Sequence, residues 1–364
     1  MPLSRVKPGQ YQQLLDEKTA RITALLSRFS PPAPTVYPSP TSGYRMRAEF
    51  RIWHDGDNLD YVMYRPDEPS VPVAINSFPV AAESIQQLMP VLREALKVSP
   101  LLRHKLFQVE FLSTLAGDML VTLAYHRKLD AQWEAMATAL AGDLGMSLVG
   151  RSRKQKIVIG RDYVEETLDV QGQLYHYRQY EQSFTQPNAA VNSRMIAWAC
   201  AQAADLTGDL LELYCGNGNF TLPLSRHFEQ VIATELAKSS VRCARENLQA
   251  NAIDNVQIIR LAAQEVTEAM TGVREFRRLE ELEKPLSAYQ LNTIFVDPPR
   301  AGLDEHTVKM AASFPAILYI SCNPQTLANN LEVLTETHRI EAFAMFDQFP
   351  YTDHMECGVL LKAI

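Results

Sequence analysis

The second half of the chain alternates between short apolar runs and helical segments, and this alternation most limits the folds available to it. From about residue 185, five runs have the length and composition of buried strands: DLLELY, QVIATE, VQIIRL, NTIFVD and ILYISC. Strands that alternate with helices are typical of a doubly wound α/β sheet. RIEAFAMFDQF and ECGVLLKAI then follow with only a short loop between them, so the final strand is expected to run antiparallel.

The first half has a different pattern. Residues 9–29 place apolar side chains at three- and four-residue steps, which predicts a helix, and the proline-rich PPAPTVYPSP follows as a stiff connector. Hairpins are predicted around HDGDN and AGD, and helical patterns lie near 81–97 and 130–144. We therefore expect a helix and connector at 1–43, an α+β domain at 44–184 and an α/β domain at 185–364.

Composition narrows the class of protein. The 364 residues carry a formal net charge of −7, so any surface for nucleic acid has to be local. The odd number and wide scatter of the five cysteines argue against a disulfide framework and favour a reducing, cytoplasmic environment. The N-terminal residues lack an apolar signal core, and the uncharged run FPAILYISCNPQTLANNL is too polar to span a membrane.

A turn with two glycines closes the first of the five strands. In DLLELYCGNGNF, Gly216 and Gly218 let the backbone approach a ligand at the carboxyl end of the strand. Thr221 stands where the dinucleotide pattern has its third glycine, which disfavours pyrophosphate. Glu235 ends the next strand, where a carboxylate can accept both ribose hydroxyls. S-adenosylmethionine fits both features. A plain tight turn, and a helix N-terminal charge for Glu235, are the structural alternatives.

Two further strands end on residues that can do chemistry. Asp297 precedes two prolines that force an extended turn, and an Asp-Pro-Pro turn beside a methyl donor indicates transfer to a planar nucleobase or amide. Cys322 closes ILYISC directly before Asn323 and Pro324, so both residues are expected in one crevice. The helix that follows is expected to lower the thiol pKa. The alternatives are a turn-capping Asp297 and a merely buried Cys322.

A cysteine and a base are both needed if the acceptor is C5 of uracil. A thiolate that adds at C6 makes C5 electron-rich, and after methyl transfer a base must remove the hydrogen from C5. The loop FDQFPYTDHMECG offers four candidate bases, which are Asp347, Asp353, His354 and Glu356. Glu356 begins the last strand, and burial there would suit it to act as a base near neutral pH. The H-x-E of HME lacks a following P-C-x-x-C, so we expect no metal.

Taken together, the motifs resemble those of the RNA uridine-5 methyltransferases, and within that family the tRNA branch. SFTQPN, LLELYCGNGNF, FVDPPRAGL, ISCNP and DQFPYTDHMECG occur in the family's order, and the similarity extends to YRMRAEFRIW. The resemblance implies a Rossmann-like methyltransferase domain that uses S-adenosylmethionine to convert uridine 54 in the T loop of tRNA to ribothymidine. It implies Cys322 as the nucleophile and Glu356 as the base. It also implies that the cofactor and base pocket is lined by Gln186, Tyr214, Asn219, Glu235 and Asp297.

Four alternatives to this function are weaker. Relatives that act on ribosomal RNA often carry an N-terminal β-barrel and a four-cysteine iron–sulfur site, whereas this chain begins with a helix and lacks that cluster. RNA cytosine-5 methyltransferases place a second cysteine where Asp-Pro-Pro-Arg has none. A nicotinamide oxidoreductase would require the missing glycine, and a non-catalytic RNA-binding protein would need neither Cys322 nor Glu356.

Two basic clusters are candidates for RNA contacts. One lies along a predicted strand, where alternation puts three arginines on one face: Arg45, Arg47 and Arg51. The other is RSRKQKIVIGR, which includes Arg151, Arg153 and Lys154 and has no acidic residue. The nearby candidates for stacking on unpaired bases are Tyr44, Phe50, Trp53 and Phe107. A solvated sheet face is the alternative for each cluster.

The expected substrate also suggests a second activity. A T-loop uridine is tucked into the tRNA elbow and must be flipped out before it can react. Binding would then break contacts between the T and D arms. This leads to the hypothesis that the protein is also a tRNA-folding chaperone, and RNAs with a T-like loop are further candidate partners.

Overall fold

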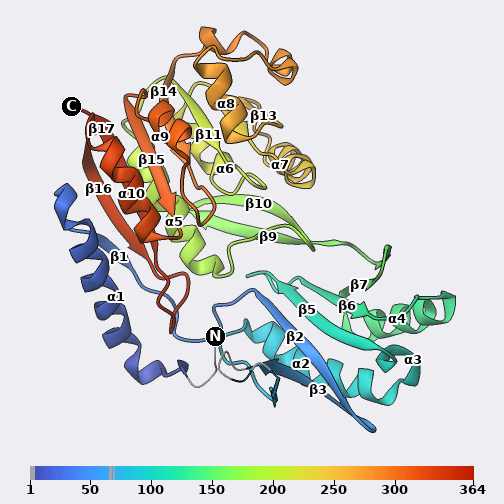
Figure 1. The fold of residues 1–364 in the computed structure, drawn as a ribbon. Helices are drawn as coiled ribbons and strands as arrows, with labels where there is room; N and C mark the ends of the chain where they lie inside the picture. The colour runs from blue at the N-terminus through green and yellow to red at the C-terminus, as the bar shows by residue number, and fades with distance from the viewer. Residues whose placement is uncertain (1–4, 65–67, 69) are drawn as a thin grey trace. The chain divides into compact units, whose positions relative to one another are not determined.

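The computed structural model describes residues 5–64, 68 and 70–364. The chain divides into two compact units, each of which is described by itself (Figure 1). The first unit contains residues 40–167 and 178–189, together with the described residues 5–8. The second contains residues 9–39, 168–177 and 190–364. The predicted division at 43/44 and 184/185 differs in two main respects, because both the N-terminal helix and residues 168–177 belong to the unit that holds the C-terminal strands.

The second unit is built on an eight-stranded sheet with the order β1-β16-β17-β15-β14-β11-β12-β13. Its strands are β1 (Thr35–Tyr37), β11 (Asp209–Leu213), β12 (Val231–Thr234), β13 (Val256–Ile259), β14 (Leu291–Val296), β15 (Ala316–Ser321), β16 (His338–Phe346) and β17 (Glu356–Ala363). Only β17 runs antiparallel to its neighbours. This confirms the predicted doubly wound sheet with a final antiparallel strand.

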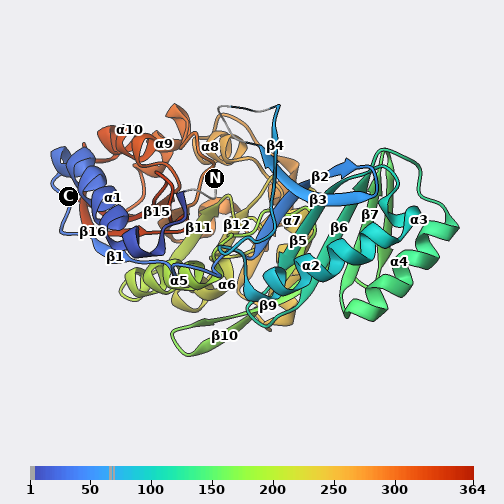
Figure 2. The ribbon, with the colours of Figure 1, turned by 90° about the horizontal axis from the view of Figure 1, so that it is seen from below.

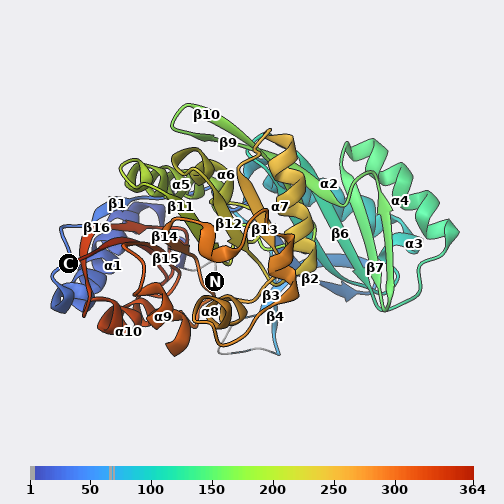
Figure 3. The same ribbon diagram turned by 90° about the horizontal axis from the view of Figure 1, so that it is seen from above.

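Helices cover both faces of this sheet. They are α1 (Tyr11–Leu26), α5 (Ala189–Ala203), α6 (Thr221–Leu224), α7 (Lys238–Ala250), α8 (Ala263–Met270), α9 (Glu305–Ala311) and α10 (Pro324–Leu334). Figures 2 and 3 show α8, α9 and α10 on one face and α5 and α6 on the other. Short 3-10 turns occupy Pro8–Gln10, Ser27–Phe29, Ser225–His227, Arg277–Glu281 and Leu286–Ala288. None of the helices in the described ranges is long and apolar enough to cross a membrane.

The proline-rich connector forms a strand, which the sequence analysis did not predict. β1 lies at the edge of the sheet and pairs in parallel with β16, with Val36 opposite Met345. Prolines flank this strand but do not occur within it. An edge position tolerates such neighbours, because only one side of the strand has to offer hydrogen bonds.

The first unit holds a seven-stranded sheet with the order β4-β3-β2-β5-β6-β7-β8. Its strands are β2 (Arg47–Asp55), β3 (Asn58–Tyr64), β4 (Pro72–Ala74), β5 (Leu106–Ser113), β6 (Met119–Tyr125), β7 (Ser147–Ser152) and β8 (Gln155–Ile159). Its helices are α2 (Glu83–Val98), α3 (Pro100–Arg103) and α4 (Ala131–Leu144). The two predicted hairpins, β2–β3 and β5–β6, and the predicted helices α2 and α4 are confirmed.

Two hairpins were not predicted. The basic run at 151–161 forms the end of β7, a turn, all of β8 and the two residues after it, so most of its side chains lie along a sheet. The second hairpin joins β9 (Tyr163–Val170) to β10 (Gln173–Tyr180). Its turn has positive φ at both Gln171 (55°) and Gly172 (83°). That combination suits a two-residue hairpin turn, but Gln-Gly is a weaker signal than Asn-Gly.

Candidate active site

Cys322 stands at the carboxyl end of a fully buried strand. All six residues of β15 are buried, and Asn323 begins α10 as its N-cap, where its side chain accepts a hydrogen bond from the Gln325 N–H at 3.2 Å. Pro324 occupies the first turn, where a missing N–H costs nothing. Four of the five cysteines are buried, whereas Cys322 is half-buried. The break after the strand therefore leaves this thiol accessible.

The antiparallel final strand brings Glu356 to the same edge. β15 and β17 pair Ile320 with Gly358 and Ser321 with Cys357. One step further along this register, Cys322 faces Glu356, and facing residues of antiparallel strands have Cβ atoms about 5 Å apart. The Glu356 side chain is only 4% exposed. Because β17 runs against its neighbours, its first residue meets the last residues of the parallel strands.

Asp297 lies directly after β14, the strand beside β15. Its turn is tied to the cysteine loop, because the Asn323 amide donates to the Arg300 carbonyl at 3.2 Å. Gly302 N–H donates to the Pro299 carbonyl at 2.8 Å and closes the turn. The structure thus brings Asp297 and Cys322 to the same edge of the sheet, as the order of strand ends predicted, and the start of β17 adds Glu356 there.

All three acidic groups at this edge have raised pKa values, and burial is the largest cause in each. Burial raises the pKa of Glu356 to about 8, and the Asp297 charge contributes. Asp297 keeps part of its surface exposed, yet desolvation raises its pKa to about 7. Burial raises the pKa of the Cys322 thiol to about 11, with further contributions from Glu356 and Asp297, while Arg300 acts in the opposite direction. The expectation that the helix start lowers the thiol pKa is wrong, because desolvation and two carboxylates outweigh a helix end already capped by Asn323.

The other candidate bases in the final loop are engaged elsewhere or more exposed. The Asp347 carboxylate is buried and forms an ion pair with Lys18 at 2.7 Å. Asp353 and His354 are exposed. Desolvation and the Arg300 charge lower the pKa of His354. Glu356 is therefore the candidate that combines burial, a raised pKa and a position opposite Cys322.

The glycine turn after β11 forms a cradle of backbone groups. Tyr214, Gly216 and Gly218 all have left-handed φ angles, of 62°, 56° and 87°. A side chain added at Gly218 would meet the Leu222 side chain at 2.5 Å, whereas one added at Gly216 would meet nothing within 4 Å. Open space therefore lies beside Gly216, as a ligand that approaches the backbone requires.

Glu235 joins this cradle from the end of β12. Its two carboxylate oxygens accept hydrogen bonds from Gly216 N–H at 3.2 Å and from Ala237 N–H at 2.7 Å. Each oxygen retains a second lone pair for a ribose hydroxyl. The residues present thus fit a nucleoside cofactor such as S-adenosylmethionine.

Asn219 has a different environment from the one expected. Its side-chain amide exchanges two hydrogen bonds with that of Asn192 on α5, at 2.8 and 2.9 Å. The Tyr177 hydroxyl donates to the Asn219 carbonyl at 3.0 Å. Asn219 therefore anchors the turn to its surroundings. Asn192 and Tyr177 were not predicted, because nothing in the sequence indicates a contact between such distant segments.

Glu212 is a further residue that the sequence analysis missed. It lies inside β11, is buried, and among the described residues its Oε2 has no hydrogen-bond partner. Burial raises its pKa to about 8, and the Asp297 charge contributes. The sequence could have indicated Glu212, because a carboxylate is unusual in the middle of an apolar run such as DLLELY.

Gln186 belongs to the first unit and lies in the loop between β10 and α5. Its role in the pocket stays a prediction.

The candidate RNA surface belongs to the first unit. Burial alternates along β2, so the odd-numbered residues, including Arg47 and Arg51, share the more exposed face. Arg45 donates to the Arg47 carbonyl at 2.8 Å, and Arg47 donates to the Ser183 carbonyl at 3.0 Å. Burial lowers the pKa of both arginines. Arg45 and Arg47 therefore have structural roles as well.

The aromatic candidates separate into two groups. Tyr44 and Phe50 are buried, so their proposed stacking on bases is wrong. Trp53 is 47% exposed. Phe107 is half-buried, with its ring stacked on His126 at 3.9 Å and the Arg51 guanidinium 5.5 Å from its centre.

The second basic cluster is partly neutralised. Arg151 forms an ion pair with the buried Glu181, and Lys156 pairs with Asp162 at 2.7 Å. Arg153 and Lys154 are exposed in the turn between β7 and β8.

In the described part of the chain, no group of three His, Cys, Asp or Glu side chains could hold a metal ion.

Comparison with known proteins shows the family of the chain. A family model described as tRNA (Uracil-5-)-methyltransferase matches residues 10–364. A tRNA/tmRNA (uracil-C(5))-methyltransferase of Acinetobacter baylyi is 55% identical over 97% of this chain and 99% of its own length. That of Vibrio cholerae is 54% identical over 98% of both. The solved structure of Pyrococcus abyssi tRNA (uracil-54, C5)-methyltransferase with S-adenosyl-L-homocysteine is similar in fold, with a TM-score of 0.73 at 20% identity, over 96% of this chain and 83% of that one.

Proposed function

The chain belongs to the tRNA (uracil-5-)-methyltransferase family, and from this premise we propose that it methylates C5 of the T-loop uridine 54 of tRNA through a covalent bond to Cys322. The observation that carries the mechanism is that Cys322 and Glu356 directly adjoin the paired residues Ser321 and Cys357 at the carboxyl edge of the sheet. The alternatives, a ribosomal RNA uridine or a cytosine as acceptor, have no comparable support in the relatives' names.

The first step is addition of the Cys322 thiolate to C6 of uracil. The S–C6 bond forms, the C5–C6 double bond opens, and the resulting enolate makes C5 nucleophilic. Because the thiol pKa is raised to about 11, most of the thiol is protonated in the free protein. Its proton passes to the nearby Asp297 carboxylate, whose pKa is raised to about 7, as the thiolate adds to C6, so Glu356 stays available to accept the C5 proton.

The glycine turn and Glu235 would hold S-adenosylmethionine, which supplies the electrophilic methyl group to C5. In this assignment Gly216 allows close approach of the cofactor, and Glu235 accepts the ribose hydroxyls with the lone pairs that its backbone contacts leave free. Tyr214 and Asp297 flank the same edge of the sheet.

Glu356 then completes the reaction as the base. After methylation C5 carries both a methyl group and a hydrogen. Glu356 takes this hydrogen as a proton, the C–H electrons restore the C5–C6 double bond, and the S–C6 bond breaks to release Cys322 as thiolate. A pKa of about 8 makes Glu356 a stronger base than an ordinary carboxylate, which is the property this step requires.

The relatives' names suggest a wider set of substrates. They are described as tRNA/tmRNA (uracil-C(5))-methyltransferases, so we include the T-like loop of tmRNA as a second candidate. Exposed basic residues of the first unit, Arg51, Arg153 and Lys154, are the proposed phosphate contacts. All five cysteines are free, which suits a reducing cytoplasm.

A mechanism-based substrate tests this proposal directly. A T-arm stem-loop with 5-fluorouridine at position 54 should form a methylated adduct that cannot be released, because fluorine is not abstracted as a proton. Intact mass after denaturation should show protein plus methylated RNA, and Cys322→Ser should show none. Glu356→Gln should keep the adduct. Matched hairpins with 5-fluorocytidine, or with a ribosomal RNA sequence, should stay unbound; an adduct only with one of these would contradict the proposed substrate.

A further inference from the structure

The loop between β16 and β17 carries the chain to Glu356. It contains residues 347–355, and its first residue is anchored to the edge strand, because Asp347 N–H donates to the Tyr37 carbonyl at 3.0 Å. The loop ends where Glu356 enters β17, opposite Phe346 of β16. Its conformation therefore sets how the backbone approaches the proposed base.

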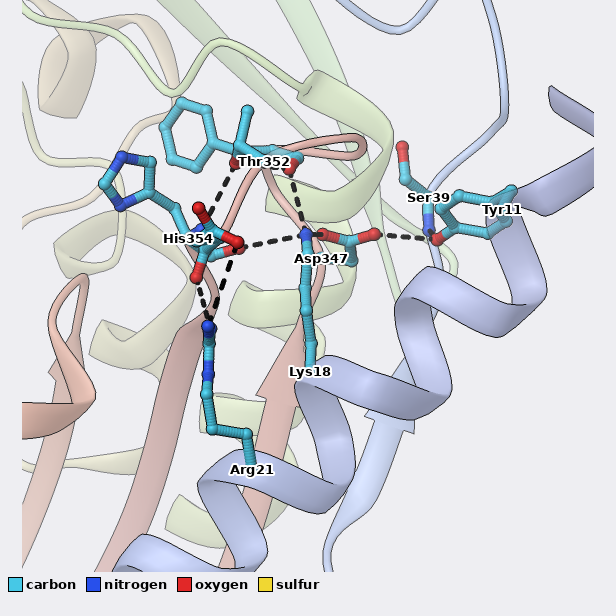
Figure 4. A network of polar contacts seen from close by, with 9 residues as sticks. Tyr11, Lys18, Arg21, Ser39, Asp347, Thr352 and His354 are labelled. Atoms are coloured by element: carbon cyan, nitrogen blue, oxygen red, sulfur yellow. Dashed lines mark hydrogen bonds and ion pairs between the residues drawn. The ribbon is translucent and has the colours of Figure 1, made fainter. Parts of the chain in front are cut away.

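This loop is folded around the ammonium group of Lys18, as Figure 4 shows. Lys18 lies on α1, more than 300 residues earlier in the sequence, and is only 5% exposed. Its Nζ donates to Asp347 Oδ1 at 2.7 Å, to the Phe349 carbonyl at 3.0 Å and to the His354 carbonyl at 3.0 Å. All three N–H groups of the ammonium are thus used. One acceptor begins the loop, and another lies two residues before Glu356.

Further contacts from the same helix complete the arrangement. The Tyr11 hydroxyl donates to the second Asp347 oxygen at 2.9 Å and itself accepts a hydrogen bond from Ser39 N–H at 2.7 Å. Arg21 donates to the Asp353 carbonyl at 2.5 Å. The polar side chains on this face of α1 are therefore directed at one target, the loop that precedes Glu356.

Docking of α1 alone does not account for this geometry. Well-packed apolar side chains could attach a helix at least as strongly, because a buried ion pair loses much of its attraction to desolvation. Apolar side chains could not hold two loop carbonyls at fixed positions. Two of the three Lys18 acceptors are such carbonyls, so the ammonium specifies the conformation of the loop as well as the position of the helix.

We propose that Lys18 is a positioning residue for Glu356, and that α1 thereby controls the proton-abstraction step. This inference rests on the proposed role of Glu356 as the base. It implies that loss of the ammonium slows removal of the C5 proton far more than formation of the methylated adduct, because Cys322 lies between β15 and α10, outside this loop.

The test measures the two steps separately. A T-arm hairpin with tritium at C5 of the target uridine reports proton abstraction as tritium release, and labelled S-adenosylmethionine reports methyl transfer. In single turnover, Lys18→Met should leave methyl transfer within about twofold of the wild type and slow tritium release at least about tenfold. A denaturation-resistant methylated complex should accumulate as a result.

Three further variants distinguish positioning from a loss of stability. Lys18→Met combined with Asp347→Asn removes both buried charges, so no carboxylate is left unpaired, and it should still accumulate the complex. Tyr11→Phe should give a smaller effect in the same direction. Arg28→Gln removes an exposed ion pair between the segment after α1 and Glu332 of α10, and it should behave like the wild type.

The outcomes separate this inference from the mechanism on which it rests. If Glu356→Gln accumulates the complex while the Lys18 variants slow both steps equally, or neither step, the positioning role is wrong and the base assignment stands. If Glu356→Gln releases tritium at the wild-type rate, the base assignment is wrong and the inference is overturned with it.

Discussion

At the scale of single residues, the reactive groups could be named from the sequence, but their proton affinities could not. Cys322 and Glu356 were singled out because one ends a buried strand and the other begins one. The direction of the thiol pKa was predicted wrongly, since it depends on desolvation and on two carboxylates that come from other strands. Such terms exist only after the strand ends have met.

The effect of the Glu356 charge on the Cys322 thiol gives a prediction for the thiol pKa. Glu356→Gln removes a negative charge beside Cys322, so the thiol pKa should fall from about 11 while staying above its ordinary value, because burial is the largest cause. Alkylation occurs through the thiolate, so its pH midpoint should move to lower pH. A fall of one unit would speed alkylation by roughly tenfold well above pH 8, where Glu356 of the wild type is ionised.

Rates of iodoacetamide labelling at Cys322, followed by peptide mass across the pH range, would measure this effect. The exposed Asp353 serves as the control, since its charge does not contribute to the shift at Cys322. An unchanged midpoint in Glu356→Gln, or an equal change in Asp353→Asn, would contradict the assigned cause.

At the scale of elements, periodicity predicted most helices and strands, and turn chemistry predicted the hairpins only where its signal was strong. The five strands of the α/β half were found because continuous apolar runs mark strands buried on both faces. β1 was missed because it is three residues long and lies among prolines. The β9–β10 hairpin was missed because its turn uses Gln171 at positive φ, which is an uncommon choice.

The contact between α5 and the glycine turn gives a prediction at this scale. Asn192→Ala leaves the Asn219 amide without its two hydrogen bonds in a partly buried place. An unsatisfied group of this kind costs about 1–3 kcal/mol, so binding of S-adenosylhomocysteine should weaken by roughly tenfold as the turn loses its anchor. Ser193→Ala, one residue further along α5, is the matched control. Calorimetric titration would show whether affinity depends on Asn192 alone.

At the scale of the whole molecule, the acidic chain has to present cations locally to bind RNA. Arg153 and Lys154 are exposed at the β7–β8 turn, whereas Arg151 is held by Glu181. If the turn contacts phosphates, Arg153→Gln with Lys154→Gln should raise KM, leave kcat unchanged and reduce the salt dependence of binding by about one unit of slope per lost contact. Binding isotherms at several salt concentrations would measure it, with Lys97→Gln on α2 as a control. An unchanged slope would remove this turn from the RNA surface.

The expected opening of the tRNA elbow gives a second prediction at this scale. If binding separates the T and D arms, then Cys322→Ser should still accelerate refolding of misfolded tRNA, because the cost of opening is met by contacts rather than by the covalent step. Aminoacylation competence after a brief incubation would report refolding. A Cys322→Ser protein that binds tRNA yet gives no acceleration would contradict the chaperone hypothesis.

The sequence by itself determined the order of the strands along the chain, the residues at their tips and the family to which the chain belongs, because these follow from local periodicity and short motifs. Only the tertiary structure decided which tips face one another. The antiparallel course of β17 brings Glu356 next to Cys322. Lys18 of α1, more than 300 residues earlier in the sequence, lies inside the loop that precedes Glu356. A buried ammonium is stable only among acceptors supplied by the folded chain, so no local pattern can reveal it.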